Sequence, residues 1–214
     1  MAHVGGRRFD ETAGLVPTVR AILAGVALLV LGASCVQEAQ ADPDPARIVE
    51  GARLSVSRKP WYDGSYVRMP FPGGDPGWER GVCTDLVIRA FRHAGIDLQE
   101  QVHRDVLARP GAYGLRRADP NIDHRRVRHL RTFFERHWAR ATGWRPGDVV
   151  IWDLEGGTFA NHIGIVSDRR SRDGTPLVIH HMNRTGPFTG YPGEDDSLFR
   201  WRVLGHFRWA GERP

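Results

Sequence analysis

Apolar residues recur at helical spacing through the first two thirds of the chain. Asp44 followed by Pro45 is typical of a helix start and predicts a helix over residues 46–54. After Cys83, an apolar stripe with arginines on the opposite face predicts a second helix, which Gly95 ends. The stripe consists of Leu86, Val87, Ala90, Phe91 and Ala94.

Two more helices are expected before the pattern changes. Asp97 and Glu100 form a capping box for a helix that runs to about residue 107. Asp123 is expected to cap another helix, and its apolar face consists of Val127, Leu130, Phe133 and Phe134. Residues 59–78 are rich in Pro, Gly, Tyr and Trp without a sustained period, which predicts an ordered but irregular loop.

Beyond Gly143 the pattern becomes that of β-strands. Residues 149–152 are apolar on both faces and predict a buried strand. Further strands are expected at residues 162–167, 176–182 and 198–209, with Asp173-Gly174 as the turn between the second and the third. Because helices come first and an antiparallel sheet second, the chain is predicted to have an α+β fold.

The N-terminal segment has the features of a secretion signal. Arginines precede an uncharged apolar run over residues 21–33, and residues 39–41 offer a small-x-small cleavage site. We therefore expect a signal peptide over residues 1–41, a single domain over residues 42–214, and a location in the periplasm or cell envelope. Cleavage at Cys35 to give a lipoprotein is the main alternative, and among the cleaved forms only this lipidated one would be tied to a membrane. The remaining alternative is that the segment is not cleaved and serves as a membrane anchor.

The chain is basic, with a formal net charge of +5. Three arginines and three acidic residues balance within the first 41 residues, so cleavage leaves this charge unchanged. A basic surface suits an anionic polymer of the cell envelope. No nucleic-acid-binding motif is present, so no nucleic-acid partner is expected. The sequence does not indicate an oligomeric state.

Cleavage of the signal would leave Cys83 as the one cysteine of the mature chain. A thiol at a helix N-terminus feels the positive end of the helix dipole, which favours the thiolate. His162 at the start of one predicted strand and His180 near the end of the next can lie side by side. His181 should point to the opposite face, where it is expected to be exposed. A thiolate, an imidazole base and a group that orients it are what a cysteine hydrolase needs, whereas each residue alone is more often structural.

Short motifs of the chain resemble those of the NlpC/P60 cell-wall peptidases. These are Cys83 at a helix start, Pro146-Gly147-Asp148-Val149-Val150, His162-Ile163-Gly164-Ile165 and Val178-Ile179-His180. Residues 81–90, 119–127 and 152–154 resemble more specifically the DUF1287 group of exported bacterial proteins. The NlpC/P60 resemblance implies a papain-like core, with Cys83 as nucleophile, His162 as base and His180 as orienting residue, acting on peptidoglycan stem peptides. It implies neither a cofactor nor a metal.

The chain departs from the NlpC/P60 pattern in two places. Thr84-Asp85 follows the cysteine, where the family usually has Ser-Gly, and extra helices lengthen the segment between the cysteine and His162. Asp85 is expected to raise the pKa of the thiol if it faces Cys83, and otherwise to bind substrate amines or a loop backbone, or to cap the helix. The extra helices are expected to reshape the substrate cleft.

Other polar residues have open roles. Tyr66 stands where a tyrosine often assists the oxyanion in the NlpC/P60 peptidases, and Tyr62 is its rival. Asp153 either orients His162, lines the cleft or ends a strand. Arg125 either recognises a substrate carboxylate or belongs to a solvated helix start.

Two further classes of function remain open. Cys83, His162 and His180 could bind zinc, with Asp153 or water completing a tetrahedron, although no short Cys/His spacing supports this. An inactive module of the same fold, which holds wall peptides or a partner protein, is the other.

Overall fold

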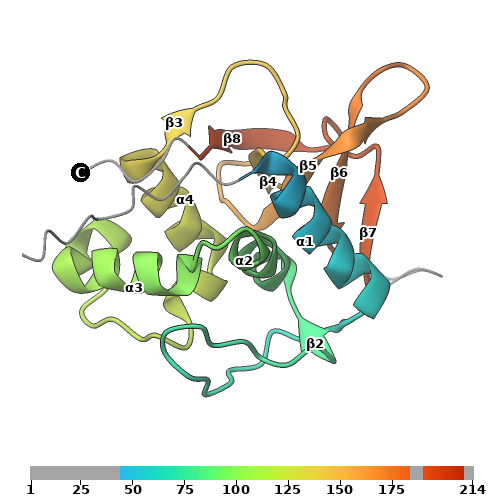
Figure 1. Cartoon of the computed structure of the whole chain (residues 1–214). Helices are drawn as coiled ribbons and strands as arrows, with labels where there is room; N and C mark the ends of the chain where they lie inside the picture. The colour runs from blue at the N-terminus through green and yellow to red at the C-terminus, as the bar shows by residue number, and fades with distance from the viewer. Residues whose placement is uncertain (1–43, 184–189, 210–214) are drawn as a thin grey trace, which may run out of the picture. The chain divides into compact units, whose positions relative to one another are not determined.

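The computed structural model of the protein describes residues 44–183 and 190–209. In this part of the chain, four α-helices and an antiparallel sheet give the α+β arrangement that the sequence predicted (Figure 1). The expected signal peptide and Cys35 lie outside the described residues. Within those residues, no helix is both long enough and apolar enough to cross a membrane.

Helices α1, α2 and α3 begin where the sequence predicted, within one residue. Helix α1 (Pro45–Arg58) is capped by Asp44, whose carboxylate accepts a hydrogen bond from Ala46 N, and it ends four residues later than expected. Helix α2 comprises Cys83–His93 and helix α3 comprises Leu98–Ala108. The α3 cap is Asp97, which accepts hydrogen bonds from the amides of Gln99 and Glu100.

The start of helix α4 (Val127–His137) differs from the prediction. Asp123 begins a short 3-10 turn, η2 (Asp123–Arg125), instead of capping the helix; a second such turn, η1, comprises Pro110–Tyr113. The Asp123 carboxylate is engaged elsewhere, because its Oδ2 lies 2.9 Å from His103 Nδ1 and accepts a hydrogen bond from Asp119 N. It therefore joins α3 to the loop before α4.

A six-stranded antiparallel sheet forms the second half of the domain, in the order β3-β8-β4-β5-β6-β7. The strands that the sequence predicted are β4 (Val149–Asp153), β5 (His162–Arg170), β6 (Pro176–His181) and β8 (Arg202–Arg208). Two short strands that were not predicted, β3 (Ala139–Arg140) and β7 (Pro192–Asp195), form its edges. A separate parallel pair, β1 (Trp61–Tyr62) and β2 (Arg80–Gly81), lies at the ends of the predicted loop.

The two faces of the sheet are packed differently. Helices α1 and α2 pack on β5 and β6, and the main core lies between them. In Figure 1, α1 and α2 lie in front of these strands. Alternate residues of β4, β5 and β6 pack on the other face with Leu198, in a smaller cluster that includes Val150, Trp152, Val166 and Val178. Residues one position apart in β5 or β6 therefore belong to different clusters.

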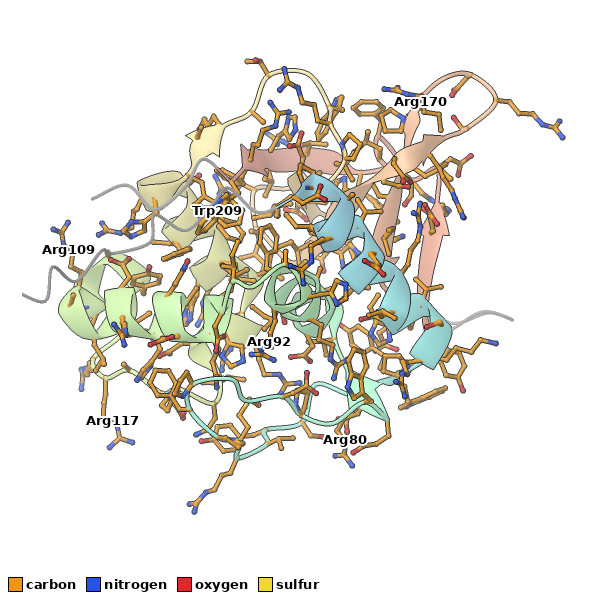
Figure 2. All side chains as sticks on the ribbon, in the orientation of Figure 1. Arg80, Arg92, Arg109, Arg117, Arg170 and Trp209 are labelled. Carbon is orange, nitrogen blue, oxygen red and sulfur yellow. The ribbon has the colours of Figure 1, made fainter. Side chains whose placement is uncertain are left out.

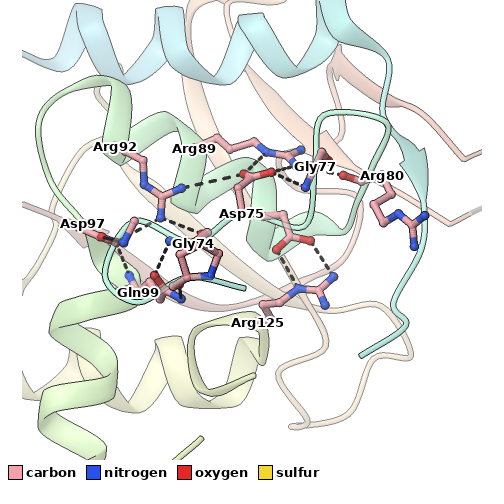
Figure 3. Close-up of polar contacts among 12 residues, drawn as sticks. Gly74, Asp75, Gly77, Arg80, Arg89, Arg92, Asp97, Gln99 and Arg125 are labelled. Atoms are coloured by element: carbon pink, nitrogen blue, oxygen red, sulfur yellow. Dashed lines mark hydrogen bonds and ion pairs between the residues drawn. The ribbon is translucent and has the colours of Figure 1, made fainter. Parts of the chain in front are cut away.

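The loop between α1 and α2 is held by two arginines of α2, the buried Arg89 and the partly exposed Arg92, rather than by regular structure. Arg89 forms two 2.7 Å hydrogen bonds with the Asp75 carboxylate, and Arg92 bonds to Gly74 O and Asp97 (Figure 3). Other arginines are solvated: Arg109 and Arg117 extend away from the ribbon (Figure 2). The irregular loop is thereby fixed against the second half of α2.

Candidate active site

Cys83 is the first residue of α2 and is only 3% exposed. Burial is the main cause that raises the pKa of its thiol, to about 12, and the negative charge of Asp85 adds to this effect. The backbone N–H groups of Ile163, Thr84 and Cys83 itself act in the opposite direction. The expectation of a low thiol pKa is therefore wrong, because the loss of hydration outweighs the helix terminus, and Cys83 is a neutral thiol near pH 7.

Asp85 and Arg125 support the start of α2. The Asp85 carboxylate accepts a hydrogen bond from Val82 N (2.8 Å), which closes the first turn of the helix. Arg125 donates to both carboxylate oxygens and also to the carbonyl of Ser65 (2.8 Å). Because its side chain is 1% exposed, Arg125 neither meets a substrate carboxylate nor belongs to a solvated helix start, so both predicted roles are wrong. Asp85 caps the helix and also raises the pKa of the Cys83 thiol, as expected if it faces the thiol.

His162 and His180 form a buried imidazole pair. His162 Nε2 lies 2.7 Å from His180 Nδ1, and both residues are buried. The sheet register brings them together. His180 pairs with Gly164, and Gly164 is two residues after His162 on the same face of β5. The Trp152 ring stacks on His162 at 5.5 Å between centroids. Burial is the main cause that lowers the pKa of His162 well below its usual value, and a positive charge on His180 would lower it further, so the His162 ring is neutral at pH 7.

Asp195 and Ser197 extend this pair and were missed by the sequence analysis. Asp195 Oδ2 lies 3.1 Å from His180 Nε2, and Asp195 Oδ1 accepts a hydrogen bond from Ser197 N (3.0 Å). Although burial acts in the opposite direction, the hydrogen bond from His180 lowers the pKa of Asp195 to about 2. No sequence signal pointed to Asp195, since its strand is short and its role depends on pairing with β6.

Tyr62, rather than Tyr66, lies beside the thiol. The Tyr62 hydroxyl hydrogen-bonds to the Cys83 side chain, and burial is the main cause that raises the pKa of this tyrosine. Tyr66 is 55% exposed and donates to Asp119 Oδ2 (3.0 Å), so its hydroxyl is occupied in the neighbouring loop. Between the two tyrosines considered from the sequence, the structure brings only Tyr62 to Cys83.

His181 faces the helices, as strand alternation predicted, but it is 1% exposed rather than at the surface. Its ring meets the Tyr62 ring edge-on at 5.0 Å between centroids, and its Nε2 lies 3.0 Å from Gly190 O. Burial lowers its pKa. His181 thus packs behind Tyr62.

Asp153 organises the loop that leads into β5. Its Oδ1 accepts a hydrogen bond from Glu155 N (2.8 Å) and its Oδ2 accepts one from Phe159 N (2.7 Å). The carboxylate therefore stabilises the chain just before His162 and is not the group that holds the imidazole, which is His180.

Cys83 lies beside the start of β5, where His162 is located, but the thiol and the His162 ring pack in different places. The thiol lies against the N–H of Ile163, which places it beside the backbone of His162. Cys83 packs with the helices, whereas the His162 ring packs on Trp152 of the other face. In the described part of the chain, no direct hydrogen bond joins the thiol to a His162 ring nitrogen. A preformed thiolate–imidazolium pair is thus absent from these residues.

The proposed zinc ligands are not arranged around a common point. His162 Nε2 and His180 Nδ1 face each other in a hydrogen bond, so these two nitrogens cannot both face a shared ion. Across residues 44–183 and 190–209, no group of three or more His, Cys, Asp or Glu side chains is placed to hold a metal.

Comparison with known proteins assigns the family. Residues 49–209 match the family described as "Domain of unknown function (DUF1287)". The chain is also 45% identical over 172 residues to the "Uncharacterized protein YijF" of Escherichia coli (strain K12), a match that covers 76% of this chain and 80% of that protein. The family match includes Cys83, Tyr62 and the whole imidazole pair. On both findings, the chain belongs to the DUF1287 family.

Proposed function

We propose that this protein is an exported thiol hydrolase with a papain-like core of the NlpC/P60 type, and that it cleaves an amide bond in peptidoglycan stem peptides. One observation carries the proposal: the Cys83 thiol lies at a helix N-terminus against the N–H of Ile163, and His180 holds the ring of the adjacent residue, His162. Nucleophile, base and orienting group thus belong to three elements, α2, β5 and β6, that pack on one another.

The protonation states favour general-base chemistry over a resting ion pair. Because the pKa of Cys83 is raised and that of His162 is lowered, both groups are neutral before substrate binds. His162 Nε2 is engaged by His180, which leaves Nδ1 as the nitrogen for the thiol proton. In the proposed reaction, His162 takes this proton as the sulfur attacks the amide carbonyl.

The remaining steps are those of acyl transfer through a thioester. The tetrahedral intermediate collapses to a thioester when the C–N bond breaks, and the imidazolium of His162 gives its proton to the leaving amine. Water, deprotonated by His162, then releases the acid product and the free thiol. The hydroxyl of Tyr62 and the N–H groups at the start of α2 are the candidate donors to the oxyanion.

The substrate class rests on the resemblance to NlpC/P60 peptidases and on the charge of the chain. The formal net charge of +5 suits an anionic wall polymer, and the signal-like N-terminus fits delivery to the envelope.

Digestion of purified sacculi tests the proposal, with released fragments identified by mass spectrometry. Wild-type protein should release peptide fragments, whereas Cys83→Ala and His162→Ala should release none. Asp196→Asn is the matched control, because this exposed carboxylate neighbours the site without belonging to it, and its turnover should equal that of wild type. Equal release by wild type and Cys83→Ala would show that the thiol is not the nucleophile.

An inactive wall-binding module is the second candidate. It is favoured by the burial of Cys83 and by the packing of the thiol and the imidazole pair in different clusters. This alternative predicts that wild-type protein sediments with sacculi, releases nothing, and binds equally well as Cys83→Ala. Turnover by wild type excludes it.

A further inference from the structure

We infer that Asp195 is a positioning residue that fixes the tautomers of two histidines in series, so that His162 presents a bare Nδ1. The chain of contacts runs from Asp195 Oδ2 to His180 Nε2 (3.1 Å), and from His180 Nδ1 to His162 Nε2 (2.7 Å). The assigned tautomers do not depend on the proposed function, whereas their catalytic consequence rests on it.

The direction of the first hydrogen bond follows from charge. The low pKa of Asp195 keeps it ionised at neutral pH, and a carboxylate can only accept hydrogen bonds. His180 Nε2 must therefore carry the proton. Asp195 Oδ1 is already held by Ser197 N at 3.0 Å, so the carboxylate is fixed with Oδ2 toward the ring.

The direction of the second hydrogen bond follows from the first. When His180 carries its one ring proton on Nε2, its Nδ1 is bare and can only accept a hydrogen bond. His162 Nε2 must then donate, which places the one proton of this neutral ring on Nε2 and leaves Nδ1 as a lone pair. The carboxylate thus determines the free nitrogen of an imidazole that it does not touch.

Packing keeps the two rings in this orientation. The Trp152 ring stacks on His162, and the Trp201 ring meets His162 and His180 at 6.2 and 6.1 Å between centroids. Gly164 leaves the space beside His180, because a Cβ there would lie 3.0 Å from His180 Cβ. With both rings buried and enclosed by aromatic groups, a ring flip is costly and the hydrogen-bond order is preserved.

Asp195 also favours the step in which His162 becomes charged. When Nδ1 takes the thiol proton, the ring is an imidazolium that still donates from Nε2 to His180. The negative charge of Asp195 raises the pKa of His162, against the larger effect of burial. Asp195 therefore acts through His180 in two ways, by orientation and by charge.

Side-chain ¹⁵N NMR of the histidines tests the assignment directly. Long-range ¹H–¹⁵N spectra of wild-type protein near pH 7, assigned with His162→Ala and His180→Ala, should show both rings neutral and protonated at Nε2. A doubly protonated His180, or an Nδ1–H tautomer of either ring, would overturn the inference. This measurement needs no activity, so it remains decisive if no substrate is cleaved.

Asp195→Asn supplies the second arm. Ser197 N should hold the amide oxygen in place of Oδ1, which turns the NH₂ group toward His180 Nε2 and reverses both hydrogen bonds. Both rings should then be protonated at Nδ1, and kcat should fall roughly 10²- to 10⁴-fold with little change in KM. Asp196→Asn is the matched control and should keep the wild-type spectra and rate. Unchanged ring spectra in folded Asp195→Asn contradict the inference.

The outcomes for the two proposals are separable. If the predicted tautomers are observed but no substrate is cleaved, the role of Asp195 stands and the proposed hydrolase activity is wrong. If turnover depends on Cys83 but other tautomers are observed, the hydrolase activity stands and the proposed role of Asp195 is wrong.

Discussion

Arg125 holds the carboxylate of Asp85 in a buried ion pair, with Nε 2.9 Å from Oδ1 and Nη2 3.0 Å from Oδ2. The pair joins the η2 turn to the first turn of α2, and Arg125 also bonds to the carbonyls of Ser65 and Asp63. The segment that carries Tyr62 is therefore anchored to the same arginine that supports the Cys83 helix.

Arg125→Met is expected to lower the free energy of unfolding by about 3–5 kcal/mol, because it leaves the Asp85 carboxylate buried without its partner. Chemical denaturation followed by circular dichroism measures this. Arg126→Met is the control; its exposed side chain should matter by less than about 0.5 kcal/mol. Equal stabilities of the two variants would mean that the ion pair does not support the fold.

The raised thiol pKa predicts how Cys83 reacts with iodoacetamide. With a pKa of about 12, the thiolate fraction should rise about tenfold per pH unit, without a plateau between roughly pH 6 and 9. Intact-mass kinetics in a Cys35→Ser background measure the rate, with a small thiol peptide of pKa about 8.5 as reference. A plateau below roughly pH 8 would instead indicate a preformed thiolate.

The sequence predicted helices and central strands well because their patterns are local. The apolar stripe of α2 and the buried run of β4 each fix their own structure and the face that they bury. The pairing of His162 with His180 could also be anticipated, since adjacent antiparallel strands bring such positions side by side. Asp195 could not, because its contact depends on how β7 pairs with β6.

The pKa values of the site could not be predicted from local sequence patterns. The helix N-terminus correctly indicated groups that favour a thiolate, but the larger effect is burial of Cys83, which depends on tertiary packing. Likewise, whether Tyr62 or Tyr66 reaches the thiol depends on the path of the loop. That path is set by the distant residues Arg125 and Asp119.

Buried neutral histidines predict acid sensitivity. Burial is the main cause that lowers the pKa of His124, His129, His162 and His181; for His124 it falls to about 3. Below the unfolded pKa of about 6.5, the unfolded chain binds more protons than the folded one, so stability is lost as pH falls. Between about pH 6.5 and 5, His124 alone should cost about 2 kcal/mol.

Urea unfolding at several pH values measures this dependence. The low pKa of Asp105 and of Asp195, each about 2, affects stability only below roughly pH 4, so the histidines dominate above it. His124→Phe should reduce the slope of the free energy of unfolding against pH by about one proton, because the imidazole binds a proton only in the unfolded chain. The substitution breaks no hydrogen bond at Nδ1, which has no partner among the described residues. If the slope of this variant equals that of wild type, His124 does not contribute to the loss of stability at acidic pH.

Tyr62 and Tyr66 offer a paired test of the oxyanion role. Tyr62→Phe should lower kcat on sacculi roughly 10²-fold if its hydroxyl supports the oxyanion. Tyr66→Phe removes a hydrogen bond to Asp119 in an exposed loop and should leave turnover within about twofold of wild type. The reverse order of effects would restore Tyr66 as the assisting residue.

Gly164 and Gly193 flank His180 from the two neighbouring strands and give the most closely matched pair of variants. A Cβ at Gly164 would lie 2.9 Å from Ile179 O, 3.0 Å from His180 Cβ and 3.2 Å from the Trp152 ring, whereas a Cβ at Gly193 meets nothing within 4 Å. Gly164→Ala should therefore lower the free energy of unfolding by about 1–3 kcal/mol, as overpacking does. It should also separate His180 from His162, which weakens their hydrogen bond and shifts their side-chain ¹⁵N signals.

Gly193→Ala should leave both the stability and the signals unchanged, since its methyl group enters open space. If Gly164→Ala is destabilised while the imidazole signals stay unchanged, the strand contact is tight but does not position the pair, and the close approach at Gly164 then serves the fold alone.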